Sequence, residues 1–183
     1  KSIESVYVDL AIIYSGNFYM NLDVKTPAGR IGNILELVKP AAVITNNQYE
    51  KNIREILPKG VALINLDAVE WGTEVYDEKV LSERLSTLID TDPLCIINTS
   101  GSTGTPKGVV LNHRSFFDFT EWAQEEFGFT DHEVIGSLSP LVFDIYSYEL
   151  CLLMSRGSTM VLIPDHLSAF PVMILKLLQE KKV

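Results

Sequence analysis

The sequence has few cysteines, few basic residues and no long hydrophobic run. Its two cysteines, Cys95 and Cys151, lie far apart, each within an apolar stretch. This arrangement is neither a disulfide framework nor a zinc motif, so we expect a reducing compartment and a cytoplasmic protein. The His, Cys and carboxylate residues nowhere show metal-ligand spacing, so we expect no metal site formed by protein side chains alone.

Basic residues are outnumbered by acidic ones. Lys and Arg number 15 against 24 Asp and Glu, which gives a formal net charge of −9. A nucleic-acid-binding surface needs clustered Lys and Arg, and the only basic cluster is Lys181-Lys182, so nucleic acid is not an expected partner. No stretch of about 18 apolar residues occurs and no signal peptide is visible, so we expect no membrane span.

The chain does contain enough apolar residues for a folded core. Hydrophobic residues make up 46% of the 183 positions, which excludes a disordered chain. The length corresponds to about one domain. Because the chain begins at Lys1 rather than Met and ends within an apparently helical stretch, residues 170–183, we expect both ends to be cut from a longer polypeptide.

Short apolar runs alternate with longer amphipathic ones along the chain. The short runs predict buried strands at residues 18–22, 41–45, 61–66, 94–99, 108–112, 134–138 and 159–163. The amphipathic segments predict helices at residues 2–15, 27–38 (with Thr26 as N-cap), 76–89, 115–127, 147–155 and 169–180. This alternation predicts an α/β fold with a largely parallel sheet flanked by helices. Residues 67–76 form either a domain boundary or a surface connection within one domain.

The most informative segment is a glycine-rich loop at residues 99–108, which reads TSGSTGTPKG. It lies between two predicted strands and contains three glycines, five hydroxyl side chains, one lysine and no acid. Glycines let the backbone N–H groups approach a phosphate chain, hydroxyls donate hydrogen bonds to its oxygens, and a lysine adds positive charge. A flexible Ser/Gly-rich surface loop is the alternative, but the flanking hydrophobic strands favour a phosphate site.

Two common nucleotide-binding motifs do not match this loop. A Walker loop requires Gly, Lys and Ser or Thr in succession and a following helix, whereas here Pro106-Lys107-Gly108 precedes a predicted strand. The dinucleotide fingerprint G-x-G-x-x-G is also absent. The sequence therefore excludes both the P-loop NTPase and the Rossmann dehydrogenase interpretations.

The loop closely resembles the phosphate-binding motif of the adenylate-forming enzymes, which include acyl-CoA synthetases, luciferases and the adenylation domains of nonribosomal peptide synthetases. Two further segments agree in order and spacing. Residues 15–23, SGNFYMNLD, followed by Pro27 and Arg30, resemble the family motif GAAYVPLD…P…RI, and Phe143-Asp144 resembles the FDxS motif of the amino-acid-activating branch. Residues 119–122 and 126–129 resemble the D-alanine–carrier protein ligases. The resemblance covers the whole chain.

The resemblance implies a reaction and its participants. A substrate carboxylate attacks the α-phosphorus of ATP, pyrophosphate leaves, and the acyl adenylate then passes its acyl group to the phosphopantetheine thiol of a carrier protein. Mg²⁺ is implied to be held through the ATP phosphates and water. The implied nucleotide-binding residues are Thr99, Ser100, Gly101, Ser102, Thr103, Gly104 and Lys107. Two interpretations of Lys107 stay open, a phosphate ligand or a solvated lysine at a loop tip.

The substrate site is implied by the segment around Asp144. From the residues alone, Asp144 suits the N-cap of a helix that starts at Ile145. By resemblance, Asp144 is implied to hold the α-ammonium of an amino acid, and Ile145 and Tyr148 to begin the specificity pocket. These two bulky residues favour a small substrate side chain, with simple core packing as the alternative for Tyr148. Tyr146 stands where the motif prefers Ser.

The resemblance also implies that residues 1–183 are only part of an adenylation domain. The family's adenine-stacking segment, ribose-binding aspartate, hinge and C-terminal lysine have no counterpart here. The chain is therefore implied to lack a complete set of catalytic groups and to be inactive alone. The expected function is part of an ATP-dependent amino-acid-activating ligase. The alternatives are part of an acyl-CoA synthetase and a non-catalytic nucleotide-binding or scaffold module.

Overall fold

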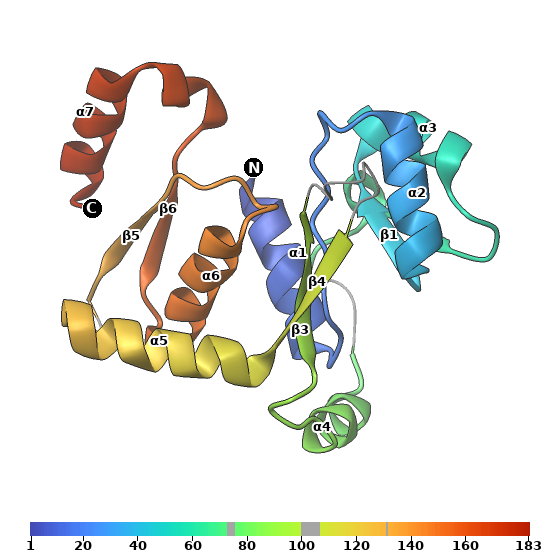
Figure 1. Ribbon diagram of the computed structural model, residues 1–183, viewed down its shortest axis with the longest axis horizontal. Helices are drawn as coiled ribbons and strands as arrows, with labels where there is room; N and C mark the ends of the chain where they lie inside the picture. The colour runs from blue at the N-terminus through green and yellow to red at the C-terminus, as the bar shows by residue number, and fades with distance from the viewer. Residues whose placement is uncertain (73–75, 100–106, 131) are drawn as a thin grey trace. The chain divides into compact units, whose positions relative to one another are not determined.

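The computed structural model describes residues 1–72, 76–99, 107–130 and 132–183 (Figure 1). The chain divides into two compact units. The first consists of Lys1–Asn21, Val80–Ile97 and Val109–Val183, and the second of Leu22–Lys79 and Asn98–Gly108. The strands β3 (Pro93–Thr99) and β4 (Lys107–Asn112) pair with each other and run through the unit boundary.

The second unit is built on a parallel strand pair. β1 (Ala42–Thr45) pairs with β2 (Ala62–Asn65) in a register that aligns Ala42 with Ala62. The helix α2 (Ala28–Val38) buries Ile31, Ile34 and Leu35 and contacts α3 (Asn47–Ile56). A short 3₁₀ turn, η1 (Leu66–Ala68), follows β2. The αL conformation of Lys39, whose N–H donates to the Leu35 carbonyl, ends α2.

The first unit contains the larger set of elements. Its helices are α1 (Ile3–Tyr14), α5 (His113–Phe127), α6 (Asp144–Arg156) and α7 (Pro171–Lys181), together with most of α4 (Glu78–Ser86) and the 3₁₀ turn η2 (Asp165–Ala169). β5 (Val134–Ser137) and β6 (Thr159–Leu162) form a second parallel pair. α6 contacts both of these strands and also α5, so it lies at the centre of the unit's packing.

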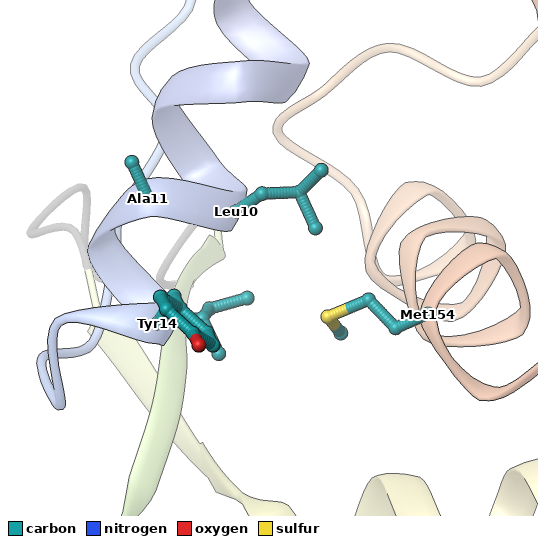
Figure 2. A pocket seen from close by; sticks show the side chains of 5 residues that line it. Leu10, Ala11, Tyr14 and Met154 are labelled. Carbon is teal, nitrogen blue, oxygen red and sulfur yellow. The ribbon is translucent and has the colours of Figure 1, made fainter. Parts of the chain in front are cut away.

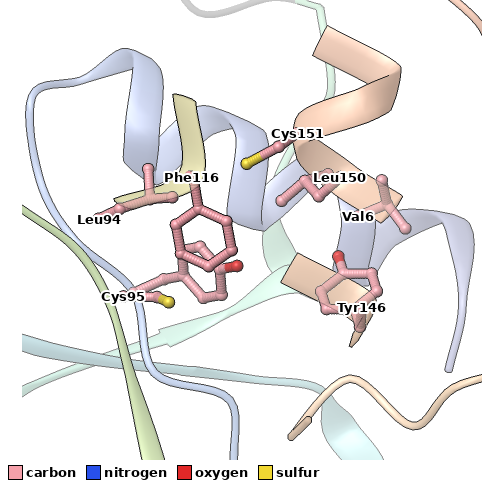
Figure 3. Packing of buried hydrophobic residues seen from close by; sticks show 8 residues of the cluster. Val6, Leu94, Cys95, Phe116, Tyr146, Leu150 and Cys151 are labelled. Carbon is pink, nitrogen blue, oxygen red and sulfur yellow. The ribbon is translucent and has the colours of Figure 1, made fainter. Parts of the chain in front are cut away.

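The core of the first unit joins segments that are far apart in the sequence. Figure 3 shows side chains from α1, β3, α5 and α6 that meet in one cluster. Its buried members are Val6, Tyr19, Leu94, Cys95, Phe116, Tyr146, Leu150 and Cys151. Both cysteines in this cluster are free thiols. None of the described helices is long and apolar enough to cross a membrane.

The structure confirms the α/β class and most of the predicted elements, but it corrects three of them. Residues 18–22 do not form a strand, because only Tyr19 pairs with β3, through a parallel bridge to Cys95. Thr26 is not the N-cap of α2, because Pro27 occupies that position. The Thr26 N–H instead donates to the Asp23 carbonyl oxygen in a turn before the helix. α6 begins at Asp144, three residues before the predicted start.

One helix was not predicted at all. α3 is strongly polar, and its sequence, NQYEKNIREI, offers no apolar run. The helix is stabilised along its exposed side by Glu50, which accepts a hydrogen bond from Arg54 one turn later at 2.8 Å. A search for apolar runs overlooks such a helix, since its apolar residues Tyr49, Ile53 and Ile56 are separated by polar ones and recur at helical spacing on one half-buried face.

Candidate functional site

The two ends of the glycine-rich loop lie side by side in the structure. Thr99 ends β3 and Lys107 begins β4, and the Thr99 hydroxyl donates to the Lys107 carbonyl oxygen at 3.4 Å. Both side chains are exposed. The loop is therefore followed by a strand, as predicted, and not by the helix that a Walker loop requires. Five predicted phosphate-binding residues, Ser100, Gly101, Ser102, Thr103 and Gly104, lie outside the described residues.

Asp144 occupies the first turn of α6. Phe143 is the N-cap and makes no side-chain capping bond, while the Asp144 carboxylate accepts a hydrogen bond from the Ile145 N–H at 2.9 Å. Asp144 is therefore the first residue of the helix and not its N-cap, which differs from the interpretation from the residues alone. The helix N-terminus stabilises negative charge. The carboxylate is exposed between Phe143 and Ile145, whose side chains are 53% and 58% exposed.

The two other predicted substrate-binding residues follow on the same helix. Ile145 is exposed beside Asp144, whereas the ring of Tyr148 packs against Phe119 of α5, with ring centroids 4.8 Å apart. The Tyr148 hydroxyl is buried, has no hydrogen-bond partner within the described part of the chain, and burial raises its pKa. Tyr148 thus packs in this structure while it keeps a free hydrogen-bonding group.

A buried carboxylate that the sequence analysis missed lies directly behind this turn of α6. Asp9 of α1 is 2% exposed, and its Oδ2 accepts hydrogen bonds from the Tyr146 hydroxyl at 2.8 Å and from the Asn21 amide at 2.9 Å. Burial raises the pKa of Asp9 to about 6, although both hydrogen bonds oppose this shift. An aspartate within the apolar sequence of α1 was the signal that could have indicated this group.

A second buried hydrogen bond reaches the same turn of α6. The Tyr19 hydroxyl donates to Ser147 Oγ at 2.8 Å, and the Cys95 thiol lies 3.8 Å from that oxygen. Burial raises the pKa of Tyr19, of Cys95 and, to about 12, of Cys151. These thiols are therefore inert core groups at neutral pH and not candidate nucleophiles.

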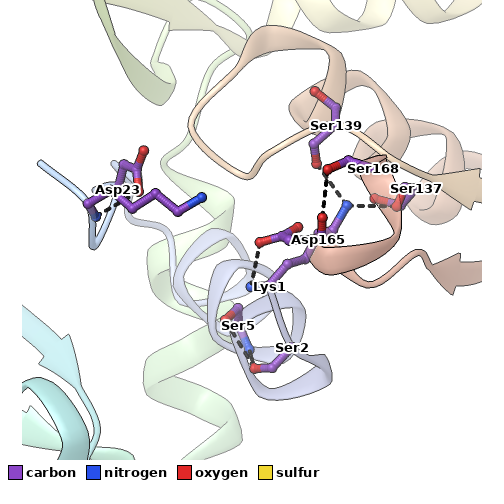
Figure 4. A network of polar contacts seen from close by, with 9 residues as sticks. Lys1, Ser2, Ser5, Asp23, Ser137, Ser139, Asp165 and Ser168 are labelled. Atoms are coloured by element: carbon purple, nitrogen blue, oxygen red, sulfur yellow. Dashed lines mark hydrogen bonds and ion pairs between the residues drawn. The ribbon is translucent and has the colours of Figure 1, made fainter. Parts of the chain in front are cut away.

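Glu149, a second carboxylate of α6, interacts with a separate polar group. Figure 4 shows this group around Lys1, Ser137 and Ser139. In that group the Lys1 ammonium donates to the carbonyl oxygens of Ser137 and Ser139 at 2.7 and 3.0 Å. Burial raises the pKa of Glu149, and this is opposed by the Ser137 hydroxyl and by the positive charge of Lys1. Within the described ranges, no three His, Cys, Asp or Glu side chains are grouped as metal ligands.

One surface hollow of about 310 Å³ lies between α1 and α6. Figure 2 shows Leu10, Ala11 and Tyr14 on one side and Met154 on the other. The lining is entirely apolar and contributes no convergent polar groups. A site for a charged substrate needs such groups, so this hollow is not the candidate site.

The whole chain matches one known family, described as AMP-binding enzyme, over residues 1–183. The chain belongs to this family. A Bacillus subtilis (strain 168) relative, a dimodular nonribosomal peptide synthase, is 32% identical over 163 residues. That alignment covers 88% of this chain and 7% of the relative, so this AMP-binding chain spans a small part of the length of the relatives that it matches.

Solved structures of adenylate-forming enzymes share the fold. The nonribosomal peptide synthetase FmoA3 in its alpha-methyl-L-serine-AMP bound form gives a TM-score of 0.71 at 25% identity, with 90% of this chain and 17% of that chain covered. A fatty acyl-adenylate ligase from L. pneumophila, in complex with acyl adenylate and pyrophosphate, gives a TM-score of 0.77 at 20% identity. The match covers 100% of this chain and 32% of the L. pneumophila chain.

Two departures from the family motifs meet at Asp9 in this AMP-binding chain. Asn21 stands at the proline of the GAAYVPLD motif, and Tyr146 stands at the serine of FDxS. Both side chains donate hydrogen bonds to the same Asp9 oxygen. The bulky Tyr146 therefore does not disturb the start of α6, because its ring is fully buried and its hydroxyl has an acceptor.

Proposed function

We propose that this chain is part of an ATP-dependent ligase that activates an amino acid as its adenylate and passes the acyl group to the phosphopantetheine thiol of a carrier protein. The observation that carries the proposal is the exposed Asp144 carboxylate at the start of α6, set between the apolar side chains of Phe143 and Ile145. A negative group in apolar surroundings is suited to an ammonium group on a small organic substrate.

ATP binding is assigned to the loop between β3 and β4. The hydrogen bond between Thr99 and Lys107 holds the two stems together, and both side chains face solvent where a phosphate chain can reach them. Ser100, Gly101, Ser102, Thr103 and Gly104 complete the proposed cover. Mg²⁺, held by the ATP phosphates and water, would neutralise part of the phosphate charge.

The proposed chemistry consists of two balanced steps. In the first, a carboxylate oxygen of the amino acid bonds to the α-phosphorus of ATP while the bond from that phosphorus to the pyrophosphate oxygen breaks. In the second, the carrier's thiol, after losing its proton, bonds to the acyl carbon, and AMP leaves. Negative charge grows on the departing pyrophosphate, where Lys107 and the loop N–H and O–H groups would stabilise it. Asp144 would hold the substrate ammonium and so orient its carboxylate toward ATP.

The test is amino-acid-dependent exchange of labelled pyrophosphate into ATP by the longer protein that carries this chain. Asp144→Asn should raise the KM for the amino acid by about 100-fold or more, since removing one partner of a desolvated charge pair costs about 3 kcal/mol or more. The KM for ATP should stay close to the wild-type value. Asp118→Asn removes an exposed carboxylate from α5 and is the matched control.

Each alternative function gives a distinct result in the same assay. An acyl-CoA synthetase would activate carboxylic acids that lack an amino group and would be indifferent to Asp144→Asn. A scaffold module would support no exchange with any carboxylic acid. We expect the isolated 183-residue chain to support no exchange, and exchange by that chain alone would contradict its assignment as part of the catalytic unit. Transfer is tested by loading of the labelled amino acid onto a phosphopantetheinylated carrier.

A further inference from the structure

One buried carboxylate oxygen joins four separate segments of the first unit. Asp9 Oδ2 on α1 accepts from Asn21, which follows α1 in the sequence, and from Tyr146 on the first turn of α6. The Asn21 amide also donates to the carbonyl oxygen of Leu141, in the loop that leads into α6, at 3.3 Å. Figure 3 shows Tyr146 beside Val6 of α1 within the core cluster.

Among the residues that the structure describes, no cation pairs with the Asp9 carboxylate. Its hydrogen-bond donors are the Asn21 amide and the Tyr146 hydroxyl. The titratable groups whose pKa the negative charge of Asp9 raises are Tyr146, Tyr19 and Cys95. All three of these groups are neutral at neutral pH. A buried carboxylate without a cation weakens the fold relative to an apolar side chain, so its use lies in where it holds its partners.

Those partners lie on either side of Asp144. Leu141 is three residues before Asp144 and Tyr146 is two residues after it, and both are tied to the same acceptor through Asn21 and the Tyr146 hydroxyl. Tyr146 is fully buried, so its ring cannot move without moving the first turn of α6. The Asp144 carboxylate is thus presented from a backbone segment that is fixed at both ends.

We propose that the buried Asp9–Asn21–Tyr146 network is a positioning device that sets the Asp144 carboxylate against the ammonium group of the substrate. This inference rests on the function proposed above, and it adds three residues that do not touch the substrate. Displacing a charged group by about 1 Å from its working position costs as much as 100-fold in activity, so a network that prevents such a shift has a measurable effect on substrate binding.

The experiment uses pyrophosphate exchange by the longer protein that carries this chain, with the KM for the amino acid, the KM for ATP and kcat measured separately. Tyr146→Phe keeps the ring and removes only the hydroxyl, and it should raise the amino-acid KM about tenfold while the KM for ATP changes by less than about twofold. Asp9→Asn keeps an oxygen acceptor for both donors, so its amino-acid KM should stay within about twofold of the wild-type value. Asp9→Leu leaves both donors without this acceptor, so it should raise the amino-acid KM by more than Tyr146→Phe does.

The matched control is Leu150→Val, which removes one methylene group from the core one turn further along α6. It should lower the melting temperature without changing the amino-acid KM. The control therefore distinguishes a displaced Asp144 carboxylate from a general loss of stability. If Tyr146→Phe yields too little folded protein, Asn21→Ala, which cuts the link between Asp9 and Leu141, should raise the amino-acid KM about threefold.

The outcomes separate this inference from the proposed function. If Asp144→Asn raises the amino-acid KM but Tyr146→Phe, Asp9→Leu and Asn21→Ala leave it unchanged, the positioning role is wrong and the proposed function stands. If Asp144→Asn itself has no effect, the proposed function fails first. Equal changes in the KM for the amino acid and for ATP in Tyr146→Phe would also overturn the inference, since they indicate a general distortion.

Discussion

The buried carboxylate of Asp9 makes a prediction about the stability of the fold. Its pKa is raised from 3.8 to about 6 because α1 buries it, and the hydrogen bonds from Asn21 and Tyr146 only partly compensate. The perturbation is Asp9→Asn, which removes the titration but keeps an oxygen that can accept from both donors. The substitution therefore isolates the free energy of charging this group inside the protein.

The sign and size of the effect follow from the two pKa values of Asp9. In the unfolded chain the carboxyl loses its proton near pH 3.8, and in the folded chain near pH 6. Between these values the folded state holds a proton that the unfolded state has lost, so stability falls as the pH rises from about 4 to about 6 and stays lower above it. Raising the pKa of Asp9 from 3.8 to about 6 corresponds to about 3 kcal/mol.

Denaturant unfolding of the protein that carries this chain, followed at several pH values between 4 and 8, measures this effect. The free energy of unfolding of Asp9→Asn minus that of the wild type should rise by about 2.4 kcal/mol between pH 4 and pH 7, because the unfolded carboxyl is already more than half ionised at pH 4. Leu150→Val, which removes no titratable group, should give a pH-independent difference. A flat difference for Asp9→Asn would refute the reasoning, because it would mean that burial does not disfavour the Asp9 charge.

Two further predictions concern local structure, and both are checked by thermal melting. Asn112→Ala should destabilise the protein by about 1 kcal/mol, because the Asn112 side chain caps α5 by accepting from the Ser115 N–H at 2.9 Å; Asn112→Ser should recover most of the loss. Gly136→Ala should cost about 1–3 kcal/mol, since a Cβ there would lie 2.9 Å from Val183 Cγ1 and 3.2 Å from Leu178 Cδ2. The second prediction fails if the alanine variant melts at the wild-type temperature.

The fold could be predicted from the sequence wherever burial leaves a hydrophobic pattern. Each of the strands β1 to β6 lies within one residue of a predicted apolar run. Their predicted burial holds best for β3, which buries Leu94 and Cys95, and is wrong for β4, in which Val109 and Val110 are exposed.

α3 was missed because it contains no apolar run, although Tyr49, Ile53 and Ile56 recur at helical spacing and are half-buried. Residues 18–22 were wrongly assigned as a strand because the run is apolar but only Tyr19 has a pairing partner.

Only those parts of the candidate site that lie within one short segment of the sequence could be predicted. The composition of the glycine-rich loop and the residues next to Asp144 were enough to predict both features from the sequence. The structure adds a hydrogen bond from the Thr99 hydroxyl to the Lys107 carbonyl oxygen across the base of the loop. The roles of Ile145 and Tyr148 stay predictions, with Tyr148 packed against Phe119. No local pattern could reveal the pairing of Asp9 with Tyr146, because 137 residues separate them.

The two departures from the family motifs are explained together by that long-range contact. Tyr146 alone is a bulky residue at a position that favours a small one, and Asn21 alone is an amide in place of a proline. Without Asp9, the buried Tyr146 hydroxyl would have no acceptor, at a cost of about 1–3 kcal/mol, and the half-buried Asn21 amide would keep only its bond to the Leu141 carbonyl oxygen. Asp9 offers one acceptor to both donors. Removing that acceptor should therefore be more damaging than removing either donor, and Asp9→Leu should partly recover activity when combined with Tyr146→Phe, because the double change leaves no unpaired hydroxyl.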